Sequence, residues 1–140
     1  MEDMDEVDDA TALLDQYFAM WNTTDQASRH ALVERIWTDD AQYVDPRTRA
    51  LGRGQIEDMV SEVRRAAPHL SFRRVGDALM HNEFVWYAWE MCGSDGAVIG
   101  GGVSFAEIAD GRLRRLVGFF YDAAPTHTRA LFSPAVVNGR

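Results

Sequence analysis

The spacing of apolar residues changes its period near residue 69, and this change most constrains the fold. Before it, apolar residues recur every three or four positions, as on the buried face of a helix; after it they alternate with other residues, as in a strand. Four strand-like runs follow, at residues 69–81, 83–92, 98–108 and 112–122. Short connections rich in Gly, Asn and Asp join them, which predicts an antiparallel meander.

Three amphipathic helices are predicted in the first half of the chain. The first spans about residues 9–21. The second follows the turn-forming "NTTD", where Thr24 or Asp25 can cap it, and carries Trp37 on its buried side. The third has the i, i+3, i+4, i+7 apolar pattern and ends before Pro68.

A short strand, "AQYV", lies between the second and third helices and stops at Pro46. The proline ring pushes the preceding residue toward extended geometry, which places Asp45 at the strand end. Two interpretations of Asp45 stay open. It is either a pocket-facing carboxylate that abstracts a proton or activates water, or an Asx-turn residue bonded to nearby backbone.

The stretch 47–54 is expected to be a flexible loop, and it contains three arginines, Arg47, Arg49 and Arg53. We expect these side chains to be solvated. The alternative is that they attract an anionic substrate to the mouth of a pocket.

This order of elements predicts an α+β fold in which three N-terminal helices cover one face of a curved, cone-shaped antiparallel sheet. The "GGG" at 100–102 removes three successive side chains from one strand and predicts a bulge or a strong bend. We divide the chain into an acidic disordered tail (1–8), one domain (9–124) and a C-terminal extension (125–140).

Charge and composition exclude several classes of function. Six of the 22 acidic residues lie among the first ten residues, and the nearly neutral remainder lacks the basic surface typical of nucleic-acid binding. All 14 basic residues are arginine, which excludes lysine-based Schiff-base chemistry. The sequence has no histidines spaced as in a metal site, no second cysteine to form a disulfide with Cys92, and no apolar run long enough to cross a membrane. We therefore expect a cytoplasmic protein without metal, cofactor, nucleic-acid or membrane partner.

The run "FVWYAWEM", residues 84–91, is apolar on both faces of its predicted strand. A strand of this kind lies between two packed layers. Helices or a cavity account for one layer, and a second subunit accounts for the other. We expect a homodimer through the outer face of the sheet; a monomer whose C-terminal segment covers that face is the alternative.

The element order and several local strings resemble the nuclear transport factor 2-like superfamily, in particular its SnoaL-like and ketosteroid-isomerase-like branch. The resemblance covers about residues 9–124 and rests on "LLDQYFAMWNTTDQ", on "WTDDAQYVDP" followed by "GRGQIEDMV", and on "ADGRLRRLVGFFYD". It implies the curved-sheet fold. It leaves the activity open, because this fold hosts isomerases, dehydratases, epoxide hydrolases, polyketide cyclases and non-catalytic binding proteins.

The resemblance also implies residue roles. Ketosteroid isomerases use an aspartate base, with a tyrosine and a protonated aspartic acid that donate to the oxyanion. Asp45 matches the base and Tyr17 matches the tyrosine. The third position falls near Ser104, where this chain has no carboxylic acid and a hydroxyl is the weaker donor.

Two functional hypotheses follow. In the first, Asp45 and Tyr17 are the catalytic base and donor of a cofactor-independent isomerase or cyclase, with a dehydratase or epoxide-type hydrolase as a further alternative. Its substrate is a small, hydrophobic, carbonyl-bearing molecule in an enclosed apolar pocket. In the second, the same fold is a non-catalytic binding or scaffold module, which the missing third acid favours. The expected substrate-binding residues are Trp21, Trp37, Tyr43, His69, Trp89, Ser104, Phe105, Phe119 and Tyr121.

Overall fold

The structure is a computed structural model that describes residues 2–122. These residues form three helices, α1 (Glu2–Asn22), α2 (Gln26–Ile36) and α3 (Gly52–Ala66), and six strands, β1 (Trp37–Asp45), β2 (Thr48–Leu51), β3 (Ser71–His81), β4 (Phe84–Cys92), β5 (Val98–Ala109) and β6 (Arg112–Asp122). The predicted α+β class, the three helices and the four long strands are confirmed. The predicted extension 125–140 lies outside the described residues. Across residues 2–122, no helix is long and apolar enough to cross a membrane.

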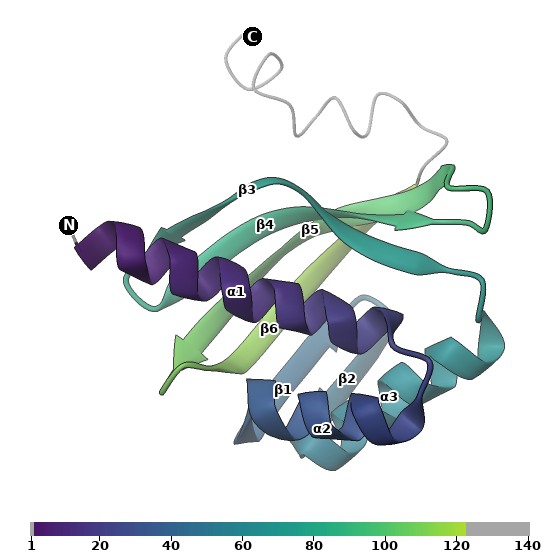
Figure 1. Cartoon of the computed structure of the whole chain (residues 1–140), viewed down its shortest axis with the longest axis horizontal. Helices are drawn as coiled ribbons and strands as arrows, with labels where there is room; N and C mark the ends of the chain where they lie inside the picture. The colour runs from purple at the N-terminus through teal and green to yellow at the C-terminus, as the bar shows by residue number, and fades with distance from the viewer. Residues whose placement is uncertain (1, 123–140) are drawn as a thin grey trace, which may run out of the picture.

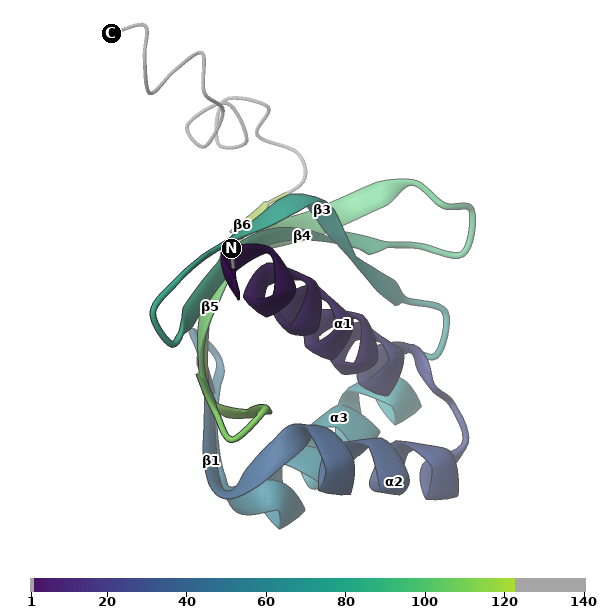
Figure 2. The ribbon, with the colours of Figure 1, turned by 60° about the vertical axis from the view of Figure 1, so that its left-hand side comes forward.

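The strands form one curved, open sheet in the order β2-β1-β6-β5-β4-β3. Strands β3 to β6 make the predicted antiparallel meander. However, β1 runs parallel to β6, so the sheet is mixed where an antiparallel one was predicted. These two strands are far apart in the chain, and no hairpin turn forces them to be antiparallel. Figures 1 and 2 show the sheet curling around α1, with α2 and α3 across its open side.

The structure differs from the predictions in the N-terminal half. Helix α1 begins at Glu2, so the acidic residues expected as a disordered tail form its first turns, where the helix dipole favours negative charge. The expected loop 47–54 contains β2, which pairs with β1 across a two-residue turn, and the start of α3. Strand β2 is too short for a period of two to be visible. Trp37 begins β1 instead of ending α2.

Polar contacts fix the helices in place. Asp25 caps α2, as predicted, by accepting a hydrogen bond from a backbone N–H of the first turn at 2.8 Å. The buried Arg64 of α3 donates to the carbonyl oxygens of Trp21, Pro68 and Leu70 at 3.0, 2.8 and 2.9 Å. These three bonds join the end of α1 to the segment that leads into β3.

The predicted bend lies at the glycine run of β5. The register between β4 and β5 shifts by one residue beside Gly100. A Cβ atom on Gly102 would lie 1.7 Å from the carbonyl oxygen of Phe119 in β6. Strands β5 and β6 therefore approach too closely for any side chain at this position, and glycine permits the curvature of the sheet.

The convex face of the sheet exposes apolar side chains. Leu79, Trp86 and Phe105 form one row across β3, β4 and β5 and are 63%, 38% and 37% exposed. Phe119 of β6 is 53% exposed. Contiguous apolar surface of this kind is the feature on which the predicted homodimer depends, and the homodimer stays a prediction.

Replacing Gly102 by alanine is expected to lower the free energy of unfolding by about 3 kcal/mol, because the added methyl group would overlap the Phe119 carbonyl. Urea unfolding followed by circular dichroism measures this loss. Gly54→Ala is the control, since no atom lies within 4 Å of its added Cβ and alanine favours the helix. A Gly102→Ala protein as stable as the native one would contradict this explanation of the bend.

Candidate functional site

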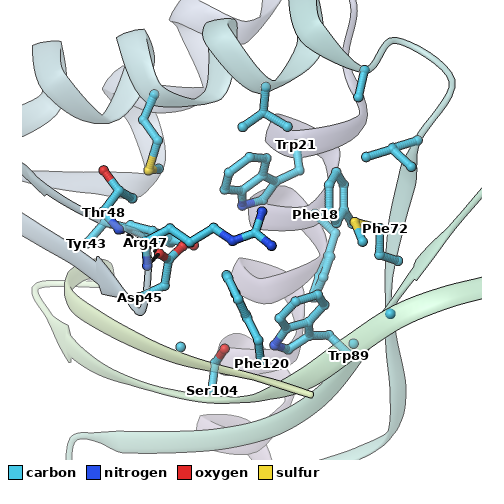
Figure 3. Close-up of a pocket in the computed structure, with 18 of the residues that line it drawn as sticks. Phe18, Trp21, Tyr43, Asp45, Arg47, Thr48, Phe72, Trp89, Ser104 and Phe120 are labelled. Carbon is cyan, nitrogen blue, oxygen red and sulfur yellow. Dashed lines mark hydrogen bonds between the residues drawn. The ribbon is translucent and has the colours of Figure 1, made fainter. Parts of the chain in front are cut away.

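A cavity of about 630 Å³ lies between the concave face of the sheet and helices α1 and α3. Small-molecule sites usually measure roughly 300–1,000 Å³, so this volume suits a small organic ligand. The cavity is partly open to solvent, where an enclosed pocket was expected. Its walls are largely aromatic, and Figure 3 shows the side chains of Phe18, Trp21, Phe72, Trp89 and Phe120 around it.

Asp45 ends β1, and its two carboxylate oxygens have different partners. Oδ1 accepts hydrogen bonds from the backbone N–H groups of Arg47 and Thr48 at 2.8 and 3.0 Å, which is the Asx turn between β1 and β2. Oδ2 accepts a hydrogen bond from the Tyr43 hydroxyl at 2.6 Å, at the wall of the cavity. The two interpretations of Asp45 are therefore compatible, because one oxygen holds the turn and the other lies among cavity groups.

The register of the sheet brings Asp45, Ser104 and Tyr87 into one row. The parallel pairing of β1 with β6 places Asp45 beside Gly118, which pairs with Ser104, and Ser104 pairs with Tyr87. A Cβ on Gly118 would lie 3.7 Å from Asp45 Cβ and 3.2 Å from Ser104 Oγ. The missing side chain at Gly118 thus leaves space in the cavity floor between the carboxylate and the serine hydroxyl.

Three tyrosine side chains, Tyr17, Tyr43 and Tyr87, meet near Asp45. The ring centres of Tyr17 and Tyr87 are 6.3 Å apart, and all three tyrosines line the cavity. Burial raises the pKa of each tyrosine well above its ordinary value, and the charge of Asp45 raises the pKa of Tyr17 and Tyr43 further. All three therefore stay protonated at neutral pH and can donate hydrogen bonds.

The Tyr87 hydroxyl differs from the other two. Tyr87 is 1% exposed, and no group in the described part of the chain gives its hydroxyl a hydrogen bond of acceptable geometry. Tyr17 and Ser104 nevertheless lie near enough to influence its pKa. A buried hydroxyl without a partner is costly for folding, and the Tyr87 hydroxyl has almost no accessible surface although the residue borders the cavity.

Three charged side chains line the cavity: Asp45, Arg47 and Glu62. Glu62 is largely exposed and forms an ion pair with Arg65. Within residues 2–122 no group of three or more His, Cys, Asp and Glu side chains is placed to hold a metal ion. The site thus offers an incoming molecule one carboxylate, one guanidinium and several hydroxyls.

Seven of the eleven predicted site residues line the cavity, namely Tyr17, Trp21, Tyr43, Asp45, Trp89, Ser104 and Tyr121. Four lie elsewhere. Trp37 is completely buried in the core, where its indole N–H contacts the sulfur of Met20 at 3.3 Å. His69 is exposed in the turn before β3.

Phe105 and Phe119 were predicted as cavity walls and instead face the convex side of the sheet. Side chains alternate between the two faces of a strand. Since Ser104 lines the cavity on β5, the next residue points outward, and Phe119 lies between two cavity residues of β6 for the same reason.

Several cavity residues were not predicted: Phe18, Arg47, Phe72, Tyr87, Met91 and Phe120. For one of them the sequence contained a signal, since Tyr87 shares its strand face with the predicted Trp89. Arg47 was expected to be solvated, with a place at the mouth of a pocket as the alternative, because its direction depends on the Asx turn made by Asp45.

The helices, the open curved sheet and the cavity between them define a class of α+β proteins in which a curved sheet and three helices surround a central cavity. The model of the SnoaL-like domain family matches residues 14–116 of this chain. The chain belongs to the SnoaL-like family, within the nuclear transport factor 2-like superfamily. No curated protein matches the chain.

Solved structures with this fold are similar to the chain over most of their length. A candidate isomerase of the SnoaL-like family from Agrobacterium tumefaciens is 28% identical, with a TM-score of 0.77 over 81% of this chain and 97% of that chain. A candidate ketosteroid isomerase from Kribbella flavida is 21% identical, with a TM-score of 0.64 over 84% and 82%. A candidate polyketide cyclase from Sinorhizobium meliloti is 18% identical, with a TM-score of 0.62 over 76% and 93%. The last two similarities concern the fold alone.

Tyr87→Phe is expected to leave the free energy of unfolding unchanged or to raise it by about 1 kcal/mol, because it removes a hydroxyl without a hydrogen bond in the described structure. Tyr43→Phe is the matched comparison: it removes the donor to Asp45 and should lower that free energy by about 2 kcal/mol. Urea unfolding of both variants measures the difference. Equal losses would show that the Tyr87 hydroxyl has a structural role.

Proposed function

We propose that the protein is a cofactor-independent acid-base enzyme of the isomerase or cyclase type, acting on a small apolar molecule that contains a carbonyl group. The observation that carries this proposal is the position of Asp45 Oδ2, which lies beside the Tyr43 hydroxyl at the wall of a cavity rich in aromatic side chains. A carboxylate can remove a proton from the carbon next to a carbonyl, and hydroxyl donors stabilise the oxyanion that forms. The aromatic walls bind the apolar body of the molecule.

Asp45, Tyr17 and Tyr87 have different roles in the proposed chemical step. Asp45 Oδ2 takes the proton and becomes a neutral carboxylic acid, while the electron pair moves onto the carbonyl oxygen. Tyr17 and Tyr87 donate hydrogen bonds to that oxygen, and Ser104 lies next to Tyr87 in the sheet. Return of the proton to a different carbon completes an isomerisation. Attack of the enolate carbon on a second carbonyl of the same molecule, with transfer of the proton from Asp45 to the oxygen of that second carbonyl, completes a cyclisation.

Tyr87 supplies what the missing acid near Ser104 would otherwise provide. In the ketosteroid isomerase arrangement, a protonated acid is the second donor to the oxyanion. Here the neighbouring Tyr87 offers a protonated hydroxyl, although burial raises its pKa and makes it a weaker donor than a protonated acid. Because this hydroxyl has no partner among the described residues, a substrate oxygen that bonds it displaces no existing hydrogen bond, but neighbouring side chains must move because the hydroxyl is buried.

A non-catalytic binding module is the second candidate, and one observation favours it. Both oxygens of Asp45 already accept hydrogen bonds in the structure, from Tyr43 and from two backbone N–H groups. A base must release part of this bonding to take a proton, whereas a binding site need not. The dehydratase alternative loses its candidate histidine, because His69 lies exposed outside the cavity.

Asp45→Asn is expected to lower kcat/KM by roughly 10² to 10⁴ on any β,γ-unsaturated ketone that the native protein isomerises, because the amide cannot act as a base. Absorbance of the conjugated product measures the rate. The amide oxygen of asparagine can still accept the turn hydrogen bonds.

The matched control is Asp58→Asn, an exposed carboxylate on α3 outside the cavity, which should retain the native rate. Equal rates for the native and Asp45→Asn proteins would remove Asp45 from the mechanism. Tight binding of such ketones without any turnover would favour the binding module.

A further inference from the structure

Arg47 places a positive charge inside the cavity, and the proposed function makes no use of it. It is the second residue of the two-residue turn between β1 and β2, and Asp45 Oδ1 accepts a hydrogen bond from its backbone N–H at 2.8 Å. Its guanidinium carbon lies 5.7 Å from the centre of the Phe120 ring. Figure 3 shows the side chain extending from the turn into the cavity, toward Trp21 and Phe120.

Arg47 forms no ion pair with any residue between 2 and 122. The two acids that share the cavity with it have other partners: Asp45 accepts from Tyr43 and from the turn backbone, and Glu62 pairs with Arg65. Arg53 gives a contrast, since it pairs with Asp39. The guanidinium of Arg47 therefore keeps its N–H donors free for solvent or for a ligand.

The surroundings of Arg47 suit a ligand with one negative charge. The Phe120 ring supports the guanidinium through a cation–π contact and restricts its position. Arg47 is an exposed residue that lines the cavity, and a guanidinium binds a carboxylate through two parallel hydrogen bonds. One arginine, with two acids nearby, cannot compensate a doubly charged phosphate equally well.

We propose that Arg47 is a specificity-determining residue and that the molecule bound in this cavity carries a carboxylate. This inference rests on the proposed function for the opposite end of the molecule, where a carbonyl faces Asp45 and the tyrosines. Together the two ends define the substrate class as a keto acid with an apolar or aromatic body. Asp45 then contributes to the recognition of both groups: its Oδ2 atom faces the carbonyl, and its Oδ1 atom fixes the turn that holds Arg47, which binds the carboxylate.

Two probes of nearly equal shape separate the charge from the rest of the molecule. 2-Naphthoate carries a carboxylate, and 2-acetylnaphthalene carries a neutral acetyl group in the same place. Equilibrium dialysis measures the dissociation constant of each with the native full-length protein and with Arg47→Gln. We expect Arg47→Gln to bind 2-naphthoate about tenfold more weakly and 2-acetylnaphthalene within about twofold of the native protein, since the lost interaction is charge-assisted.

Arg49→Gln is the matched control, because Arg49 is exposed, follows a cavity residue in the same strand and does not line the cavity. It should change neither dissociation constant. Equal weakening of both probes by Arg47→Gln, unchanged binding of 2-naphthoate, or no binding of 2-naphthoate to the native protein would overturn the inference.

Different results would contradict the proposed carbonyl site at Asp45 and the proposed carboxylate site at Arg47. Binding of 2-acetylnaphthalene with no effect of Arg47 on 2-naphthoate contradicts the carboxylate inference alone. Failure of the native protein to bind 2-acetylnaphthalene, combined with Arg47-dependent binding of 2-naphthoate, supports the inference and counts against a carbonyl site at Asp45. Thermal unfolding of each variant confirms that the protein is folded in the assay.

Discussion

The close approach of β5 to β6 at Gly102 is the constraint on which the rest of the structure depends. A side chain at this position would collide with the backbone of Phe119, so only glycine lets the two strands close and the sheet bend. The bend turns one face of the sheet into a concave wall around α1 (Figure 2). Without this curvature the aromatic side chains of β4 and β6 would not surround a cavity, and Asp45 and Tyr87 would not face a common space.

Asp45 connects the architecture to the chemistry. Its Oδ1 atom organises the turn between β1 and β2 and fixes the backbone from which Arg47 extends. Its Oδ2 atom lies in the cavity beside Tyr43. A structural role and a chemical role are often treated as alternatives for one acid, but the two oxygens of a carboxylate can separate them. As a consequence, Oδ2 already accepts a hydrogen bond from Tyr43 before a substrate binds, and part of this bond must be released for Asp45 to take a proton.

The sequence predicted the helices, the long strands and the bend because each has a strong local cause. Alternating apolar residues predict β3 to β6, and three successive glycines predict the bend. Strand β2 was missed because four residues are too few to reveal a period. The parallel pairing of β1 with β6 was missed because it joins distant parts of the chain, where local patterns carry no information.

The expected position at the cavity is found where a residue lies on an element whose buried face was clear, as Tyr17 and Trp21 do on α1. It was wrong for Phe105 and Phe119, because a shift of one residue moves a side chain to the other face and the sequence does not set the register. For Arg47 the sequence left two alternatives open, a solvated side chain or one at the mouth of a pocket, since its direction follows from hydrogen bonds made by Asp45. The positions of the hydrogen-bond donors and charges in the cavity are thus harder to predict from the sequence than those of its aromatic walls, because they depend more on tertiary structure.

The central claim is that Asp45 acts as a base toward a carbon next to a carbonyl, and proton exchange tests it most directly. The methyl protons of 2-acetylnaphthalene are of this kind, and NMR spectroscopy in D₂O measures how fast deuterium replaces them. The account predicts that the native protein accelerates this exchange and that Asp45→Asn loses roughly 10² or more of the acceleration. Exchange at the same rate with both proteins, under conditions where the ketone is bound, would contradict it.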